Sequence, residues 1–225
     1  MTPYWTLALE TSVTDATLLL AQDGEIFAQT SFTSERSQEC DLYGPLQGLL
    51  QKLPPATRLS EIIIGTGPGS YNGARVGIAC AQAIAQVHHC RLAGLCSFEG
   101  VPEVLESEEQ DGKAWAIGDA RRGSYFLMPI IKGRCQTAPR LLEEEGFLRH
   151  LADCDGPKIT FESVQRLPAG IECLQSHSTA AGLLSAWQRR SAKEKETLLA
   201  TPTEAFYLRP PHITKSKKKP LLTET

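Results

Sequence analysis

The stretch that most constrains this chain is residues 61–77, which join a strand, a glycine-rich loop and a helix. Three consecutive isoleucines, Ile62–Ile64, are typical of a strand that is covered on both faces. Glycines alternate with other residues over 65–69, and Pro68 stiffens the loop. Apolar residues at spacings of three and four then predict a helix. Such a strand, loop and helix N-terminus presents unpaired backbone N–H groups to an anion or to a partner.

The glycine loop matches neither of two common phosphate-binding motifs. No Gly-Lys-Ser/Thr ends it, so the lysine of a P-loop is missing. Counted from Gly65 or Gly67, the third glycine of a dinucleotide-binding fingerprint is replaced by Ser70 or Asn72. The loop is therefore either a structural strand-to-helix turn or a binding loop of another kind. In both cases Ser70 or Asn72 is the expected cap of the helix.

The predicted helix carries a stripe of small residues beside its larger apolar ones. Gly73, Gly77 and Ala81 recur every four residues, although glycine inside a helix costs about 1 kcal/mol. Such a stripe lets another element approach closely, and two hypotheses stay open: the element is the chain's own sheet, or it belongs to another subunit. The larger apolar side of the helix comprises Val76, Cys80, Ala83, Ile84 and Val87.

Composition indicates a globular protein without a strong general attraction to nucleic acid. The 225 residues are 41% hydrophobic and carry a formal net charge of −3, so any role on RNA must rest on a local patch or on a partner. The first residues show no secretory signal, and no apolar run reaches the roughly 20 residues of a membrane span. A cytoplasmic protein that does not interact with membranes is expected.

Cysteine and histidine spacings do not predict a metal site. The seven cysteines are an odd number and include no Cys-x-x-Cys pair, which is typical of reduced thiols in a cytosolic protein. The histidines form neither a His-x-x-x-His nor a His-Glu-x-x-His motif. A hydrolytic zinc or iron site is therefore not expected.

The rest of the first half predicts strands and one long helix. Three antiparallel strands are expected at 6–12, 16–20 and 26–32, the last two forming a hairpin. A leucine-rich helix is expected to begin at Ser37 and to end before Pro54. After the glycine loop and its helix, the expected elements are a strand at 91–95 and a short helix at 98–105.

An acidic, polar run at 106–112 marks the expected boundary between two halves. The second half restarts with two strands within 115–126, joined by a tight turn that holds Asp119, Arg121 and Arg122 and is either solvated or a binding element. Further expectations are helices at 141–151 and 178–190 and short strands near Ile159 and Ile171. The predicted domains are 1–105, 106–213 and a basic tail, 214–225, that is expected to be disordered.

Two halves that each open on antiparallel strands resemble the actin/Hsp70/sugar-kinase (ASKHA) superfamily. Four motifs resemble, in order and spacing, the TsaB (YeaZ-like) family, whose members are dimerisation subunits of the bacterial machinery that makes threonylcarbamoyladenosine at position 37 of tRNA (t6A37). These motifs are Leu7–Ser12, Gly67–Gly77, Asp119–Tyr125 and Tyr207–Arg209. The resemblance spans nearly the whole chain, and the central glycine motif is its most specific part.

The resemblance implies an actin/Hsp70-like, two-lobed α/β fold with mixed sheets flanked by helices. It also implies a scaffold without catalytic residues. TsaB-like proteins pair with TsaD, a larger paralogue that carries the metal and transfers the threonylcarbamoyl group, and TsaE, a P-loop ATPase, joins the pair. The chain is thus expected to reach tRNA through the complex, which uses ATP, and to have no cofactor or metal of its own.

In the family, two helices of the first lobe pack against TsaD as a helical bundle. Carried over to this chain, they are the helix after Ser37 and the small-residue helix after Asn72. The expected partner-interface residues are Gly67, Pro68, Gly69, Ser70, Tyr71, Asn72, Gly73, Ala74, Gly77, Ala81, Leu42 and Leu46.

The chain departs from the family pattern at several positions. Glu10 stands where the family commonly has Asp, and Arg36 stands where it often has His. Tyr71-Asn72 replaces Phe-Thr, and Ala74 replaces Leu. Tyr71, Asn72 and Ala74 lie where partner contact is expected, so the partner's surface is expected to have co-adapted.

Other functions remain as alternatives. In an independent actin-like ATPase or small-molecule kinase, Glu10, Thr11 and Ser12 would bracket a phosphate together with the glycine loop, as weak candidates for cofactor binding. A peptidase would need metal ligands or a Ser-His-Asp arrangement, neither of which the sequence predicts. The sequence leaves open a homodimer when the partner is absent, contact of Lys215–Lys219 with tRNA, and nucleotide at the joint interface.

Overall fold

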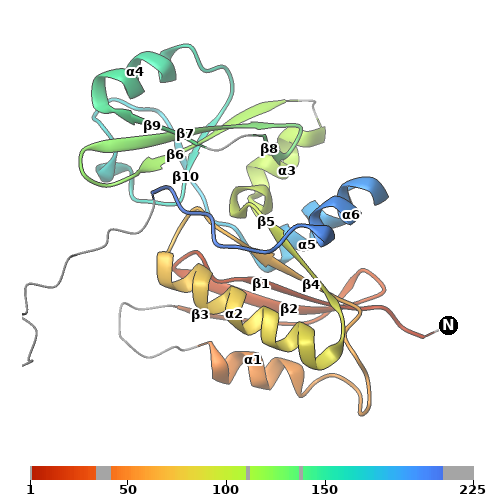
Figure 1. Ribbon diagram of the computed structural model, residues 1–225. Helices are drawn as coiled ribbons and strands as arrows, with labels where there is room; N and C mark the ends of the chain where they lie inside the picture. The colour runs from red at the N-terminus through yellow and green to blue at the C-terminus, as the bar shows by residue number, and fades with distance from the viewer. Residues whose placement is uncertain (1, 34–41, 110–111, 137–138, 210–225) are drawn as a thin grey trace, which may run out of the picture.

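The chain folds into two lobes, each built on a β-sheet (Figure 1). A computed structural model describes residues 2–33, 42–109, 112–136 and 139–209. The expected start of a helix at Ser37, the replacement at Arg36 and the basic tail lie outside the described residues.

The first sheet has five strands in the order β3-β2-β1-β4-β5. The strands β1 (Trp5–Glu10), β2 (Asp15–Gln22) and β3 (Glu25–Thr33) pair antiparallel, which confirms the predicted opening. The strands β4 (Glu61–Gly65) and β5 (Arg91–Leu95) run parallel to β1. The polar ends of β1 and β4 therefore meet at one edge of the sheet.

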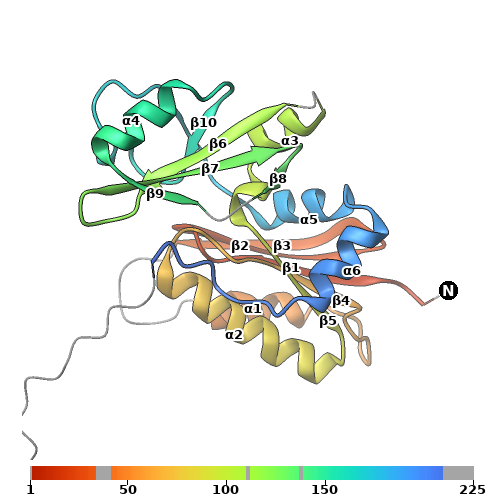
Figure 2. The same ribbon diagram turned by 45° about the horizontal axis from the view of Figure 1, so that its top comes forward.

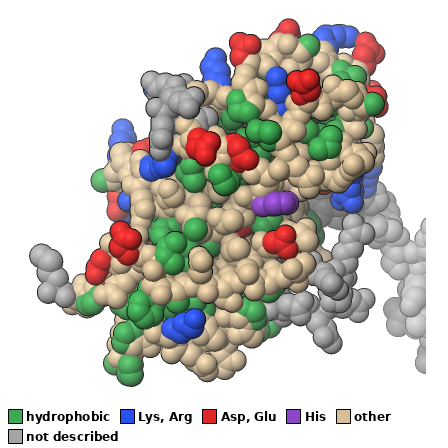
Figure 3. Space-filling model, turned by 180° about the vertical axis from the view of Figure 1, so that it is seen from behind, with side chains coloured by type: hydrophobic (Ala, Val, Ile, Leu, Met, Phe, Trp, Pro, Cys, Tyr) green, Lys and Arg blue, Asp and Glu red, His purple; other side chains and the backbone are tan. Residues whose placement is uncertain are grey.

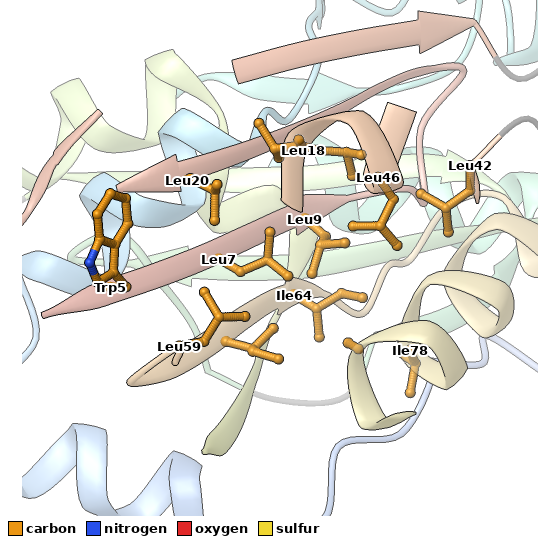
Figure 4. Packing of buried hydrophobic residues seen from close by; sticks show 13 residues of the cluster. Trp5, Leu7, Leu9, Leu18, Leu20, Leu42, Leu46, Leu59, Ile64 and Ile78 are labelled. Carbon is orange, nitrogen blue, oxygen red and sulfur yellow. The ribbon is translucent and has the colours of Figure 1, made fainter. Parts of the chain in front are cut away.

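One face of the first sheet is covered by the helices α1 (Tyr43–Leu50) and α2 (Tyr71–His88) (Figure 2). Because side chains alternate along a strand, Leu7 and Leu9 of β1 point into this layer, while Ala8 points to the opposite face. Figure 4 shows the leucines of β1 and β2 meeting Leu46 of α1 and Ile78 of α2. This layer is the main core of the first lobe.

The opposite face of the first sheet is covered by residues from near the end of the chain. The helix α5 (Ala180–Gln188) packs Leu183, Leu184 and Trp187 on this face, and α6 (Ala192–Ala200) follows it. The indole nitrogen of Trp187 donates to Glu61 Oε1 at 2.9 Å. The expected C-terminal half, 106–213, is therefore divided in space, because its last helices complete the first lobe.

The second lobe is built on a six-stranded sheet with the path β11-β10-β6-β7-β8, and β9 also pairs with β7. Its central hairpin is β6 (Lys113–Asp119) and β7 (Ser124–Ile131). On one face lie the 3-10 turn η1 (Ser97–Gly100) and α3 (Pro102–Glu109), and on the other lies α4 (Glu144–Ala152). The remaining elements are β8 (Arg134–Cys135), β9 (Arg140–Glu143), β10 (Lys158–Thr160), η2 (Val164–Arg166) and β11 (Leu174–Gln175).

Several predicted element boundaries were wrong. The single helix expected at 141–151 is a strand, β9, followed by α4, since Arg140–Leu142 pair with β7. The helix expected at 98–105 is split into η1 and α3 at Val101, whose extended backbone precedes Pro102. The helix α6 was missed because its apolar residues are few, although the capping-box pattern of Ser191 and Glu194 marks its start in the sequence.

The surface mixes charges of both signs. Seen from behind, acidic, basic and hydrophobic side chains are interspersed on that face (Figure 3). No helix among the described residues is long and apolar enough to cross a membrane.

Candidate functional site

The glycine loop meets the end of β1 in close contact. The hydroxyl of Thr11 donates to the carbonyl oxygen of Gly73 at 2.9 Å. A Cβ added at Gly77 would lie closer than 3.0 Å to the Thr11 hydroxyl, and one added at Gly73 would come as close to the Thr11 carbonyl oxygen. The two helical glycines therefore let α2 cross directly over the β1 end.

Glu10, at the end of β1, lies in a buried polar cluster. Its Oε1 accepts hydrogen bonds from the backbone N–H and the hydroxyl of Ser12, both at 2.7 Å. The Ser12 hydroxyl is also 2.8 Å from the hydroxyl of Ser97, which accepts from the N–H of Gly67 at 2.9 Å. Burial raises the pKa of the Glu10 carboxyl above its ordinary value of 4.5, and hydrogen bonds from Ser12 and Ser97 oppose that shift.

The glycine loop is folded down onto this cluster. The N–H of Ser70 donates to the Ser12 carbonyl oxygen at 2.5 Å, and a Cβ at Gly69 would collide with that same oxygen. Ser70 is the N-cap of α2, because its hydroxyl accepts from the N–H of Gly73 at 3.2 Å. The N–H groups of Gly67, Ser70 and Gly73 are thus used within the chain, whereas the sequence predicted such groups to be unpaired.

The last described segment of the chain lies over the same loop. The N–H of Phe206 donates to the Thr66 carbonyl oxygen at 2.8 Å, and the ring of Tyr207 lies 5.2 Å from that of Tyr71. The segment runs back from α6 toward the start of α2 (Figure 1). The segment therefore covers the glycine loop that, together with Glu10, Thr11 and Ser12, was the candidate phosphate site.

A second candidate site lies on the outer side of the helical layer. A groove of about 490 Å³ runs between α1 and α2, with mainly apolar surface. Tyr43, which lines the groove, is 63% exposed, and Val87, at the end of α2, is 73% exposed. The residues that line the groove are Tyr43, Leu46, Gln47, Leu50, Gln51, Cys80, Ala83 and Ile84.

Known proteins share sequence and fold features with this chain. A family model described as TsaD, tRNA N6-adenosine threonylcarbamoyltransferase, matches residues 50–138, which contain the glycine loop and α2. The tRNA threonylcarbamoyladenosine biosynthesis protein TsaB of Bacillus subtilis (strain 168) is 26% identical over 121 residues, or 53% of this chain and 52% of that protein. The chain is TsaB/YeaZ-like.

Solved structures show the same fold. YeaZ from Pseudomonas aeruginosa superposes with a TM-score of 0.62 at 20% identity, covering 93% of this chain and 100% of that one. A second Pseudomonas aeruginosa structure, described as an uncharacterised protein with similarity to the peptidase YEAZ, gives the same values. The TsaB/YeaZ-like chain thus has the predicted actin/Hsp70-like, two-lobed fold. Its sequence match spans about half the length of the Bacillus subtilis relative.

The residues expected at a partner interface differ in their exposure to solvent. Gly69, Ser70, Tyr71 and Asn72 are exposed at the start of α2. Gly73 is intermediate in exposure, and the others are buried: Gly67, Pro68, Ala74, Gly77, Ala81, Leu42 and Leu46. Of the buried residues only Leu46, which is 5% exposed, lines the groove.

The two apolar sides of α2 face different surroundings. The small residues pack on the chain's own β1 and β4, as the first of the two hypotheses for the stripe had it. The larger stripe, which contains Cys80, Ala83 and Ile84, lines the groove instead. The groove was not predicted, because an apolar helical stripe does not itself indicate which side meets the sheet.

The turn between β6 and β7 holds its own charges together. Arg121 and Arg122 both have positive φ angles, 66° and 57°, ahead of Gly123. The Arg121 guanidinium pairs with Asp119 at 3.2 Å, and Arg209 donates to the Arg121 carbonyl oxygen at 3.3 Å. The third and fourth motifs of the TsaB/YeaZ-like pattern are therefore in contact, although Arg121 and Arg209 are 88 residues apart.

No group of three or more His, Cys, Asp or Glu side chains in the described part of the chain is arranged to hold a metal ion. Glu10, Thr11 and Ser12 are brought together: the Thr11 hydroxyl bonds to α2 and the Ser12 hydroxyl to Glu10 Oε1, while Glu10 Oε2 is buried without a hydrogen-bond partner.

Proposed function

We propose that this chain is a non-catalytic subunit of a tRNA t6A37 synthesis complex, in which it pairs with a TsaD-type threonylcarbamoyltransferase. The observation that carries the proposal is the open apolar groove between α1 and α2, on a chain with sequence similarity to TsaB. In this proposal TsaE joins the pair, tRNA is reached through the complex, and ATP is used by the complex rather than by this chain.

The closed cluster around Glu10 supports a non-catalytic role. A nucleotide phosphate at the end of β1 needs free donors, and those of Ser12, Ser70 and Gly73 already bond within the chain. The buried carboxyl of Glu10 has a raised pKa, which disfavours the charged form that would hold a magnesium ion.

The exposed apolar groove supports a role in assembly. A partner helix that fills it would bury the exposed parts of Tyr43, Leu50 and Ile84 and would form a helical bundle with α1 and α2. In the absence of TsaD, a second copy of this chain is the proposed occupant, which would make a homodimer.

The test is a comparison of two new charges on the same helix. Ala83→Glu places a carboxylate in the groove, whereas Gln86→Glu places one on an exposed position that does not line it. Ala83→Glu is expected to weaken binding to TsaD of the same organism at least about tenfold, because an unpaired charge would be desolvated in the interface. Gln86→Glu is expected to bind as the wild type does.

Binding would be measured by isothermal titration calorimetry, with circular dichroism to establish that both variants are folded. Equal affinities of the two variants would contradict the groove assignment. A purified wild-type chain that hydrolyses ATP by itself, and loses this activity on Glu10→Ala, would contradict the non-catalytic role.

A further inference from the structure

Two cysteines meet where the two lobes join. Cys96 follows β5 of the first lobe and is the N-cap residue of η1, while Cys135 ends the edge strand β8 of the second lobe. Their sulfur atoms lie 2.8 Å apart, about 0.8 Å more than the length of a disulfide bond. Both residues are of intermediate exposure, although the Cys135 thiol itself is buried.

The backbone around the two sulfurs is held in place by neighbouring groups. The N–H of Cys135 donates to Glu99 Oε1 at 3.1 Å, which ties β8 to η1. The other carboxylate oxygen of Glu99 forms a buried ion pair with Arg190, which follows α5, the helix that covers the first sheet. Since these contacts do not involve sulfur, the thiols are brought together by the fold itself.

The other described cysteines lie elsewhere. Cys80 and Cys90 pack against the core of the first lobe, and Cys154 and Cys173 belong to the cluster under α4. Cys96 and Cys135 are thus in a separate environment, against the core between η1 and the second sheet.

We propose that Cys96 and Cys135 form a redox site, which a hydroperoxide converts into a disulfide that links the two lobes. One thiolate attacks the peroxide, its sulfur takes up the terminal oxygen as a sulfenic acid, and the O–O bond breaks to release the alcohol or water. The second thiol then attacks the sulfenic sulfur, the S–S bond forms and water leaves. Overall two thiols lose two electrons and two protons, and one peroxide is reduced.

Cys96 is the thiol that reacts first in this scheme. Burial, and then the neighbouring Cys96 thiol, raise the pKa of Cys135 well above its ordinary value, so the thiolate form of Cys135 is disfavoured. Cys135 then acts as the resolving thiol, already in contact with Cys96.

The disulfide would close a loop over residues 97–134 and fix β8 against η1. Because Ser97, the next residue after Cys96, holds Ser12 and Gly67, the bond would also stiffen the closed cluster around Glu10. We expect oxidation to raise the temperature of thermal unfolding by several degrees, because a cross-link restricts the unfolded chain.

The test uses the purified full chain and hydrogen peroxide. After brief treatment with a small molar excess, the remaining thiols are alkylated, the protein is unfolded and digested with trypsin, and the peptides are weighed without reduction. The expected product joins peptides 92–113 and 135–140 and is two hydrogen atoms lighter than their sum. It should vanish on reduction with dithiothreitol, and the oxidised protein should unfold at a higher temperature than the reduced one.

Matched variants separate this pair from general oxidation. Cys135→Ser is expected to abolish the cross-link and to leave a sulfenic acid on Cys96 that dimedone traps, whereas Cys173→Ser should retain the cross-link in full. The proposal is overturned if wild-type peptides 92–113 and 135–140 are recovered separately, with both thiols alkylated or with Cys96 over-oxidised. Because this readout comes from the wild type, it holds even if Cys135→Ser fails to fold.

Discussion

At the scale of single residues, the junction of β1 and α2 depends on two glycines, whose lack of a side chain allows close contact. Gly73 and Gly77 let the helix cross within contact of Thr11, and a Cβ at either would overlap Thr11 oxygen atoms. The small-residue stripe of α2 therefore packs inside this lobe.

Gly77→Ala is expected to lower the free energy of unfolding by about 1–3 kcal/mol, since the added methyl group overpacks a closed contact. Gly48→Ala is the matched control: Gly48 is also helical, but a Cβ there meets nothing within 4 Å. Its expected change is a gain of up to about 1 kcal/mol from helix propensity. Urea unfolding of both variants would measure the two effects, and a gain for Gly77→Ala would contradict the packing argument.

Glu10 gives a pH-dependent prediction. Burial raises the pKa of its carboxyl in the folded protein, so its contribution to stability is complete below the unfolded pKa and is lost as the pH rises through the folded pKa. Glu10→Gln stays neutral, so its stability relative to wild type is expected to grow as the pH rises above about 4.5. Urea unfolding across that range would measure it; a constant difference would show that Glu10 keeps an ordinary pKa.

At the scale of elements, α6 is a short helix with a capped start, whose Leu198 and Leu199 pack against the core without being fully buried. None of its residues is buried, but its first turn carries a complete capping box. The hydroxyl and the N–H of Ser191 donate to Glu194 at 2.6 and 2.8 Å. These bonds lower the pKa of the Glu194 carboxyl to about 2.

Ser191→Ala is expected to lower the free energy of unfolding by about 1 kcal/mol at neutral pH, through loss of the cap. A lowered carboxyl pKa stabilises the fold above the unfolded value near 4.5 and ceases to do so as the pH falls toward about 2. The loss on substitution should therefore shrink at acid pH. Chemical unfolding at neutral pH and at acid pH would measure this loss of stability. The surface ion-pair variant Glu196→Gln is a control that should change little.

At the scale of the whole molecule, the chain builds the first sheet, then the second, and finally returns to the first lobe. Residues 180–199 cover the first sheet, and the last described segment bonds to the glycine loop and to the turn of the second lobe. Trp187 is central to this cover, because it is 2% exposed and bonds to the buried Glu61.

Trp187→Ala is expected to cost about 3–5 kcal/mol, because it leaves a cavity on the first sheet and removes a donor from Glu61. Since the C-terminal part of the chain that contains Trp187 contacts both lobes, the backbone amides of both lobes are expected to lose protection from hydrogen exchange together. Trp187→Phe, which fills most of the space, should cost less. Unchanged protection of β6 and β7 in the alanine variant would show that the second lobe is stable independently of this cover.

The sequence by itself determined the local elements and the fold class. Alternating and continuous apolar runs predicted β1–β4 and α2, Ser70 was named as a possible cap, and four spaced motifs indicated the two-lobed fold. These features depend on periodicity and turn chemistry between near neighbours in the chain, which a sequence displays directly.

Only the tertiary structure decided which side of α2 meets the sheet, where α5 and α6 pack, and that the donors around Glu10 are satisfied within the chain. The contact of Cys96 with Cys135 was likewise invisible in the sequence. Each depends on contacts between residues far apart along the chain. Such contacts follow from how whole layers minimise exposed apolar area and unpaired polar groups, and no local pattern specifies them.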